Sequence, residues 1–320
     1  MPADDAIVQY VVPKSYAGLR ADVFLRERLK KISRTRVRSI IESGTCWFKS
    51  GRQLSPSSRV DEGEIICMRR VEREEPQVPG TYGVIHEDDR ILVVDKPAGL
   101  PVHPTSRYLK GNLLTLVRKR HSGRVLNLCH RIDRETSGIV LISKDLEGER
   151  LIKKQFSSRK VRKSYLALVL GHPEPASGTV EAALRRLPGA GIHTKMEVAG
   201  AYEVLDPGKP AVTRYRVLEV SRRFALVACF PETGRQHQIR IHMAHLGHPI
   251  VGDKLYSVSE KVFHRFTREG FSEGVAAELV LPRQALHAHT LSFLHPESAE
   301  RVVFTAELAA DIRQVFEQDK

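Results

Sequence analysis

The sequence predicts an α+β protein, with a small N-terminal domain of helices and short strands followed by a larger domain on a mixed, mainly antiparallel sheet. The chain has 320 residues, 41% of them hydrophobic, which is enough to form one large core and one small core. A polar segment with two prolines and two glycines at residues 72–83 divides it. Beyond that segment, apolar β-branched runs come in groups and do not alternate strictly with helices, which argues against a doubly wound sheet.

The first domain is expected at residues 11–71, with an α/β pattern. Residues 19–31 have apolar side chains at helical spacing, and a second helix should begin at the N-cap residue Ser33 and end before Gly44. Two short strand-like segments follow, at residues 45–48 and 64–68, with a turn at residues 49–51. The domain is therefore expected to contain two helices and a small sheet.

The positive charge of the chain is concentrated in this first domain. The formal net charge is +13, and the residues from Lys14 to Arg73 include 15 basic and 7 acidic side chains, a net charge of +8. Such clustering favours a dedicated binding module for a polyanion over a generally basic surface. Arg34, Arg36 and Arg38 lie opposite the apolar side of the second helix, which suits RNA binding and would equally suit a solvated helix face.

A membrane partner is disfavoured. No run approaches the roughly 18 apolar residues that a spanning helix needs, and no secretory leader or lipidation signal is visible. The four cysteines are far apart with no CxxC pair, which predicts reduced, mostly buried thiols and no zinc knuckle or disulfide framework. We therefore expect a cytoplasmic protein.

The second domain is expected at residues 84–320. Its strand-like runs lie at residues 91–94, 139–142, 165–170, 224–230 and 302–305, with a half-exposed strand near residues 215–219. Helical patterns occupy residues 112–120, 146–156 and 238–246. No repeat of solenoid period is evident.

Asp133 is the first candidate for chemistry. Arg131 and Arg134 flank it in the segment HRIDRETSG, directly before the buried run at residues 139–142. Nearby cations favour the ionised carboxylate that a nucleophile requires. An ordinary turn or ion pair would explain the same residues, so this segment alone leaves the two interpretations balanced.

Three further segments could contribute to the same site. Tyr165 follows a basic cluster at a strand start, where a ring can stack on a base, although an isolated tyrosine is more often part of a core. Arg240 stands between two isoleucines, and because a lone buried arginine is costly it should face a carboxylate or a phosphate. Residues 94–104, with three prolines and a glycine, form a rigid loop at a strand end, suited to substrate contact or to a structural turn.

No metal site is predicted. His242 and His245 are three residues apart, which on a helix would place them side by side, but no HExxH pattern or nearby aspartate accompanies them. The absence of a GxGxxG or P-loop pattern likewise gives no reason to expect a cofactor.

Together these four segments resemble the RluA-type family of pseudouridine synthases across essentially the whole second domain. The family pattern HRLDRxTSG is matched by His130 to Gly138, with isoleucine replacing leucine, and KPxGxxVHP is matched by Lys96 to Pro104. GRTHQIR appears as GRQHQIR, and Tyr165 stands in the KxYxA context. The first domain more loosely resembles the alpha-L RNA-binding domain, from whose usual VNG-type turn the residues WFKSG depart.

The resemblance implies an isomerase, an RNA pseudouridine synthase. Asp133 would be the nucleophile, Tyr165 would stack on the target base and Arg240 would pair with Asp133, while Arg131 would fill the gap that the flipped nucleotide leaves. For the first domain the implied RNA contacts are Arg20, Ser33, Arg34, Arg36 and Arg38.

The resemblance also implies the partner. Ribosomal RNA of the large subunit is the expected substrate, with transfer RNA second, and the protein is expected to act as a monomer without cofactor or metal. Two other readings remain open: a non-catalytic RNA-binding or ribosome-assembly protein, and a metal-dependent nuclease that uses His242 and His245.

Overall fold

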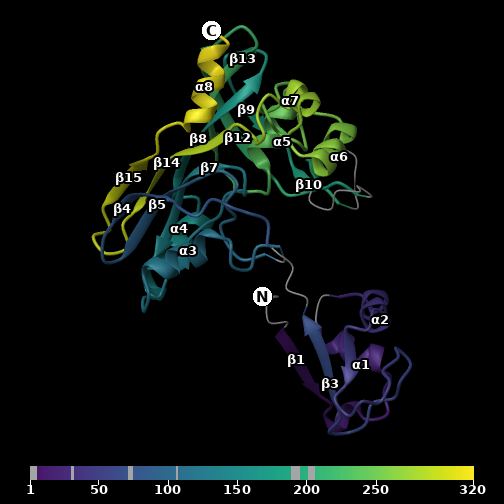
Figure 1. Cartoon of the computed structure of the whole chain (residues 1–320). Helices are drawn as coiled ribbons and strands as arrows, with labels where there is room; N and C mark the ends of the chain where they lie inside the picture. The colour runs from purple at the N-terminus through teal and green to yellow at the C-terminus, as the bar shows by residue number, and fades with distance from the viewer. Residues whose placement is uncertain (1–5, 30–31, 71–74, 106, 189–194, 201–205) are drawn as a thin grey trace. The chain divides into compact units, whose positions relative to one another are not determined.

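The computed structural model describes residues 6–29, 32–70, 75–105, 107–188, 195–200 and 206–320 (Figure 1). The chain divides into two compact units, one ending at Glu74 and the other beginning at Glu75. This division falls within the segment expected to be a linker, of which residues 72–74 lie outside the described residues. The end of the first predicted helix, at residues 30–31, lies outside them as well.

The N-terminal unit packs its helices on one small antiparallel sheet. The strands pair in the order β1-β3-β2, so the sheet begins before residue 11, where the sequence predicted the domain to start. Ser33 caps the second helix through its side chain, and Gly44 after the helix adopts φ +73°. The elements are β1 (Ala6–Val11), a 3-10 turn η1 (Lys14–Tyr16), α1 (Ala21–Arg28), α2 (Arg34–Glu42), β2 (Cys46–Phe48) and β3 (Ile65–Arg70).

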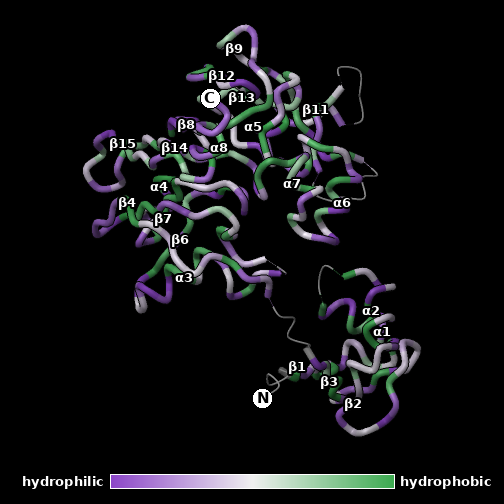
Figure 2. The backbone as a smooth tube through the Cα atoms, turned by 45° about the horizontal axis from the view of Figure 1, so that its top comes forward, coloured by the Kyte–Doolittle hydropathy of each residue, from purple (hydrophilic) through white to green (hydrophobic). Residues whose placement is uncertain are grey.

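Apolar residues of α1, α2 and the sheet form the core of this unit. Phe24, Val37, Phe48 and Ile66 are fully buried in it. Along α2 hydrophobic residues recur among hydrophilic ones at helical spacing, as expected for a helix that buries one face (Figure 2). The core is therefore built from α1, α2 and one face of the sheet.

The second unit is built on one large sheet, whose strands in the described residues follow the order β4-β5-β7-β14-β8-β13-β12-β9, with β15 paired to β14 and β6 paired to β7. All of these pairs are antiparallel except β7 with β14. The mixed, mainly antiparallel sheet predicted from the sequence is thus confirmed. The strands are β4 (Gly83–Glu87), β5 (Ile91–Lys96), β6 (Asn127–Leu128), β7 (Ser137–Ser143), β8 (Arg162–Leu170), β9 (Ser177–Glu181), β12 (Val212–Val220), β13 (Phe224–Pro231), β14 (Leu286–Leu294) and β15 (Arg301–Thr305).

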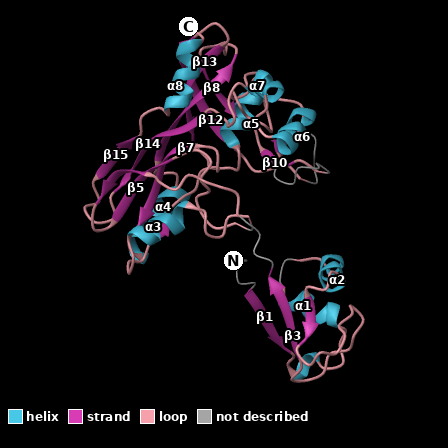
Figure 3. Ribbon diagram, in the orientation of Figure 1, coloured by secondary structure: helices cyan, strands magenta, loops and turns pink. Residues whose placement is uncertain are grey.

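Helices flank this sheet. α8 packs Ile312 and Phe316 against the cluster formed by β8 and β13, and α4 contacts β7 and β14. α6 and α7 lie beside α5, away from α3 and α4 (Figure 3). The helices are α3 (Leu113–Arg120), α4 (Leu146–Ser157), α5 (Gln238–His245), α6 (Glu260–Glu269), α7 (Glu273–Leu279) and α8 (Ala310–Gln318), and a two-stranded ribbon joins β10 (Leu184–Arg186) to β11 (Met196–Val198).

The strand and helix patterns of the sequence recur in β5, β7, β8, β13, β15, α3, α4 and α5. The sequence analysis missed β14, α6, α7 and α8. β14 is central to the sheet, but its run LHAHTLSFL contains two histidines that interrupt the apolar pattern. No helix among the described residues is both long and apolar enough to cross a bilayer.

Glycine is required where β7 and β14 meet. Gly138 has φ +104°, and a Cβ atom at that position would lie 2.2 Å from the carbonyl oxygen of Ala288. A side chain would therefore force the two strands apart. Because the segment before Gly138 carries Asp133, this close approach fixes the loop against the centre of the sheet.

Candidate active site

Asp133 lies in the loop between β6 and β7, and backbone hydrogen bonds hold that loop. The Asp133 carbonyl accepts the Thr136 N–H at 3.2 Å. The next carbonyl, that of Arg134, accepts the Gly99 N–H at 2.8 Å and the Lys96 ammonium at 3.0 Å. The rigid loop at residues 94–104 is thus in contact with the Asp133 loop, and its role at this place is to hold the backbone beside the carboxylate.

Lys96 is buried at this junction. Its Nζ donates to the carbonyls of Pro97 at 2.8 Å, Leu100 at 2.9 Å and Arg134 at 3.0 Å. Burial lowers the pKa of Lys96 to about 7. Only the ammonium form has three hydrogens for these three acceptors, so the protonated side chain is the one that ties the two loops together.

Arg240, on α5, bridges Asp133 and a second carboxylate. Its Nη1 donates to Asp133 Oδ2 at 2.9 Å, while Nε and Nη2 donate to the two oxygens of Asp253 at 2.6 and 2.8 Å. Arg240 and Asp253 are both buried. The sequence analysis expected Arg240 to face a carboxylate or a phosphate, and the arginine faces two carboxylates.

The turn before α5 is fixed by Gln238. The side-chain oxygen of Gln238 accepts hydrogen bonds from Thr233 Oγ1 at 2.6 Å and the Arg235 N–H at 3.0 Å. Its amide nitrogen donates to the Val212 carbonyl and to Thr213 Oγ1, each at 2.9 Å. This places the first turn of α5, and with it Arg240, at a defined position over β12.

The surroundings of Asp133 favour its ionised form. Burial by itself would raise the pKa of Asp133, but the charge of Arg240 and the hydrogen bonds from Arg240 and Gln284 hold it below its ordinary value. The hydrogen bonds from Arg240 and Gln284 reach Oδ2, the latter at 3.3 Å. Among the described residues Oδ1 accepts none, and it remains available to a substrate.

His237 stands close to the same carboxylate. Its Nε2 lies 3.9 Å from Asp133 Oδ2, and its Nδ1 lies 2.9 Å from the Tyr256 hydroxyl. The Tyr256 oxygen already accepts the Met196 N–H at 3.1 Å, so its own hydrogen can be donated to Nδ1. This arrangement favours the tautomer with hydrogen on Nε2, facing Asp133. Burial lowers the pKa of His237 to about 4, which keeps the ring neutral at neutral pH.

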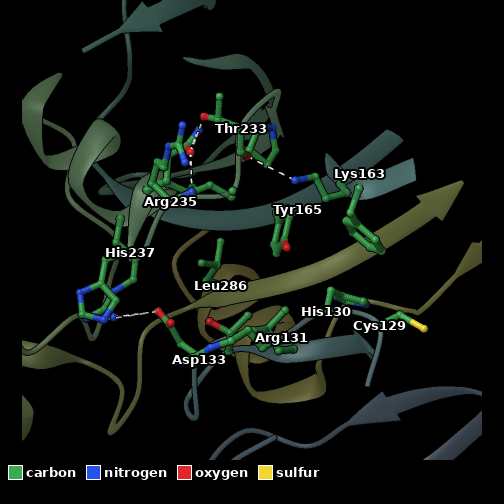
Figure 4. A pocket seen from close by; sticks show the side chains of 18 residues that line it. Cys129, His130, Arg131, Asp133, Lys163, Tyr165, Thr233, Arg235, His237 and Leu286 are labelled. Carbon is green, nitrogen blue, oxygen red and sulfur yellow. Dashed lines mark hydrogen bonds and ion pairs between the residues drawn. The ribbon is translucent and has the colours of Figure 1, made fainter. Parts of the chain in front are cut away.

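A cavity of about 290 Å³ opens beside Asp133, with Tyr165 in its wall (Figure 4). Tyr165 extends from β8 into this space, and its hydroxyl has no hydrogen-bond partner among the described residues. Burial, and to a smaller extent the charge of Asp133, raises the pKa of that hydroxyl. Lys163 also lines the cavity and donates to the Thr233 carbonyl at 3.3 Å.

Asp133, Tyr165, Arg240 and Arg131 therefore line one cavity. Arg131 is exposed and does not bond to Asp133. Its Nη1 lies 3.1 Å from His103 Nε2, a nitrogen that accepts because a guanidinium has only donors. The four residues singled out from the sequence thus meet at one place in the fold, and they come from a loop, a strand and a helix.

Four neighbours of this group were not found from the sequence: His237, Asp253, Tyr256 and Gln284. His237 lies within the same motif as Arg240, which was the available signal. Asp253 and Tyr256 lie in the segment GDKLY beyond the helix, where a glycine before an aspartate suggests a turn. Gln284 has no signal, because only the fold brings it to Asp133 across 151 positions of the chain.

In the N-terminal unit, the five residues predicted to contact RNA have different surroundings. Arg20 and Arg34 each bond to the buried carboxylate of Asp22, at 3.1 and 3.0 Å. The Ser33 hydroxyl accepts the Arg36 N–H at 3.2 Å and so caps α2. In the part of the chain that the structure describes, the exposed side chains of Arg36 and Arg38 form no ion pair.

The two histidines weighed as metal ligands differ in their environment. Both ring nitrogens of His242 are engaged, Nδ1 with Thr213 Oγ1 at 2.9 Å and Nε2 with the Ala182 carbonyl at 3.1 Å. His245 is exposed. In the described ranges no three His, Cys, Asp or Glu side chains gather as a metal site would require. The cysteines Cys46, Cys67, Cys129 and Cys229 are buried and free.

Comparison with known proteins gives one consistent result. Residues 90–245 match the family model described as RNA pseudouridylate synthase. Ribosomal large subunit pseudouridine synthase D of Xanthomonas campestris pv. campestris is 37% identical over 98% of this chain and 93% of its own length. Ribosomal large subunit pseudouridine synthase C of Vibrio cholerae is 33% identical, covering 97% and 96%.

A solved structure supports the same assignment. Human RNA pseudouridylate synthase domain containing 4 aligns with a TM-score of 0.58 and 27% identity, over 74% of this chain and 92% of that one. The chain therefore belongs to the RNA pseudouridylate synthase family, the enzymes that convert uridine to pseudouridine in RNA.

Proposed function

We propose that this enzyme isomerises specific uridines of large-subunit ribosomal RNA, with Asp133 as the nucleophile. The observation that carries the proposal is the Asp133 carboxylate, which Arg240 holds ionised at the wall of a cavity that Tyr165 also lines. The substrate is inferred from the names of the relatives, which are large-subunit synthases. Transfer RNA is the second candidate substrate.

The reaction breaks the bond between the ribose and the base nitrogen N1, turns the base, and joins the ribose to the base carbon C5. The hydrogen of C5 leaves as a proton, and N1 takes up a proton. Atoms and electrons balance without a redox partner or phosphoryl donor. The carboxylate of Asp133 supplies the electron pair for nucleophilic capture, with Oδ1 as the free oxygen. Arg240 keeps it anionic, and its charge is balanced by Asp253.

Access to the uridine requires that it leave the base stack, which costs a few kcal/mol. Tyr165 offers a ring face on which the everted base can stack. Arg131 is exposed at the rim of the same cavity and is the side chain proposed to fill the gap in the RNA. A base that fills the cavity would also exclude water, which would otherwise release the free base.

The N-terminal unit is proposed to be an RNA-binding module of the alpha-L type. Arg36 and Arg38 would be its main phosphate contacts, since Arg20 and Arg34 are paired with Asp22. The enzyme is further proposed to act as a monomer in the cytoplasm, as expected from the sequence. Light scattering of the purified protein tests that last point, and a dimer mass would contradict it.

The substrate assignment is tested by pseudouridine mapping of total RNA from cells with and without the gene. We expect one or a few positions of large-subunit ribosomal RNA to lose pseudouridine and to regain it with the wild-type gene but not with the Asp133→Asn gene. Loss confined to transfer RNA would overturn the ribosomal assignment. No loss at any position would overturn the proposed activity.

A further inference from the structure

A second and larger cavity adjoins the one beneath Tyr165. Its volume is about 650 Å³, against about 290 Å³ for the first. The two cavities share Arg131, Ile132, Asp133, His237 and Arg240 as lining residues, so Asp133 stands in the wall between them. A volume of this size falls in the range of about 300–1,000 Å³ that pockets for small organic ligands occupy.

The far wall of this second cavity is formed by α6, which presents two phenylalanines to it. Phe266 is already packed against the small core of α6 and α7, and the Lys254 ammonium lies 4.5 Å from its ring centre. Phe263 is half-buried and belongs to no hydrophobic cluster among the described residues. The ring contact of Phe263 that the structure describes is an edge contact with its neighbour His264, so its ring is available for stacking.

The cations around this cavity divide into neutralised and unpaired ones. Arg134 and Lys254 both bond to the carboxylate of Glu135, at 2.8 and 2.7 Å. Arg131 bonds only to the neutral ring of His103 in the described part of the chain. Arg107 is exposed and has neither an ion pair nor a side-chain hydrogen bond within the described ranges. Within the described ranges Arg107 and Arg131 therefore have no negatively charged partner. The phosphate of a ligand could provide one.

An aromatic ring and two unpaired arginines around one cavity match the chemistry of a nucleotide. RNA recognition commonly stacks an unpaired base on an aromatic side chain, and guanidinium groups hold its phosphate. A free metabolite would fit this chemistry too, but the shared wall at Asp133 favours RNA. A strand that delivers a uridine to the first cavity has its next nucleotide one phosphate away, within reach of the second.

We propose that the cavity between α6 and residues 101–105 and 107–108 binds the base of the nucleotide adjacent to the target uridine, stacked on Phe263, with its phosphate held by Arg107. This inference rests on the proposed function, since it requires RNA as substrate. It assigns α6 a role in choosing the sequence around the target, because the cavity accepts a base and not a paired duplex.

The test is a double-mutant cycle between protein and RNA. The RNA is a short fragment that carries the mapped uridine, made intact or with an abasic site at the 5′ or the 3′ neighbour. The protein is the full-length enzyme, as wild type, Phe263→Ala, Phe263→Tyr and Phe271→Ala. Phe271 is the matched control, an exposed aromatic residue that follows α6 and does not line the cavity.

On intact RNA we expect Phe263→Ala to lower kcat/KM by roughly 5- to 100-fold, the range that loss of one stacked base gives. Phe263→Tyr should restore it, and Phe271→Ala should match the wild type. Removing one of the two neighbouring bases should slow the wild type to a similar extent but add little to Phe263→Ala. Equal losses on intact and abasic RNA, or no loss at all in Phe263→Ala, would overturn the inference.

Arg107→Gln gives a second readout that does not depend on the packing of α6. Its affinity for the RNA should depend less steeply on salt, with the slope of log K against log salt smaller by about one. An unchanged slope would contradict the phosphate contact. If the wild type makes no pseudouridine in any RNA, both the proposed function and this inference fail, whereas an active wild type with an unaffected Phe263→Ala defeats the inference alone.

Discussion

Two aspartates in this molecule bond to arginines, but the numbers of partners are reversed. One aspartate is shared by two arginines, whereas the other shares a single arginine with a second aspartate. In the N-terminal unit, Asp22 is fully buried and two half-exposed arginines, Arg20 and Arg34, bond to it from solvent. In the second unit, one buried arginine, Arg240, bonds to two carboxylates, and 30% of the Asp133 side-chain surface is exposed. The same pair of residue types therefore builds a structural link in one unit and the proposed catalytic carboxylate in the other.

The two sites differ in whether the aspartate keeps an oxygen atom that accepts no hydrogen bond. Asp22 shares its two oxygens among two guanidinium groups, so its charge is more than compensated. Arg240 directs two of its nitrogens to Asp253 and one to Asp133, which leaves the group of three with a net negative charge. An unshared carboxylate oxygen in a cavity is what nucleophilic catalysis requires.

Of the changes considered, removal of Arg240 should have the largest effect on stability and on kcat. In Arg240→Met two carboxylates lose their buried counter-charge, and leaving a buried charge unpaired costs about 3–5 kcal/mol. We expect that loss in the free energy of unfolding, measured by urea denaturation, together with at least about 1,000-fold lower kcat. A folded Arg240→Met enzyme with nearly normal turnover would show that Asp133 does not depend on this arginine.

The pH dependence of kcat tests the same contact between Arg240 and Asp133. Because Arg240 depresses the pKa of Asp133, the carboxylate stays ionised as the pH falls below its ordinary range, and its contribution to stability is lost only when the pH falls through the depressed value. In Arg240→Gln the opposing effect of burial remains, so the acid limb of kcat should move to higher pH. An acid limb at the same pH in both enzymes would contradict the assignment.

Asp253→Asn should bring the charge balance of the site closer to that of the N-terminal link, because one arginine would then face one carboxylate. Arg240 would lose the charged partner that fixes its plane, and a displacement of about 1 Å can cost about 100-fold in rate. We expect kcat to fall by about 10- to 100-fold with KM little changed. An increase in KM alone would place Asp253 in RNA binding instead.

Tyr256→Phe tests the neutral neighbour of Asp133, for which the N-terminal link has no equivalent. Without the hydroxyl, nothing among the described residues fixes the hydrogen of His237 on Nε2. A mixture of tautomers should appear in the ¹⁵N spectrum of that ring, with a fall in kcat of about 3- to 10-fold, roughly the worth of one neutral hydrogen bond. Identical ring spectra in both proteins would show that the Tyr256 hydroxyl does not determine the tautomer of His237.

The smallest effect is expected from Asp22→Asn. It should lower the unfolding free energy of the N-terminal unit by about 1 to 2 kcal/mol, since an uncharged acceptor remains for Arg20 and Arg34. At saturating RNA kcat should equal that of the wild type, because Asp22 belongs to the other unit. A loss of kcat in a folded protein would contradict the division between a link and a reactive group.

The sequence predicted the residues of the site better than it predicted their neighbours. Asp133, Tyr165 and Arg240 lie in short segments with strong local patterns, and the cost of burying Arg240 alone already implied a carboxylate or a phosphate as its partner. That Asp253 is the second partner could not be predicted, because the pattern does not say how the chain turns after α5. His237 was missed for a similar reason, since its left-handed backbone, with φ +56°, is uncommon for any residue other than glycine and is not marked by a local sequence pattern.

The fold shows the same limit. Strands with continuous apolar runs, such as β7 and β13, were predicted from composition, whereas β14 was missed because His287 and His289 break its pattern. Arg20 and Arg34 were predicted as RNA contacts from the resemblance of the first domain to an RNA-binding domain. The pairing of Arg34 with Asp22 depends on the packing of α1 against α2, which no local pattern reports.

The central claim is that the Asp133 carboxylate performs the isomerisation, and the most direct measurement is tritium release from RNA labelled at uridine C5 by the Asp133→Asn enzyme. Asparagine nearly preserves the shape and can still accept the Arg240 hydrogen bond, so the account predicts normal folding and RNA affinity with no tritium release. Release at a rate near that of the wild type would contradict it.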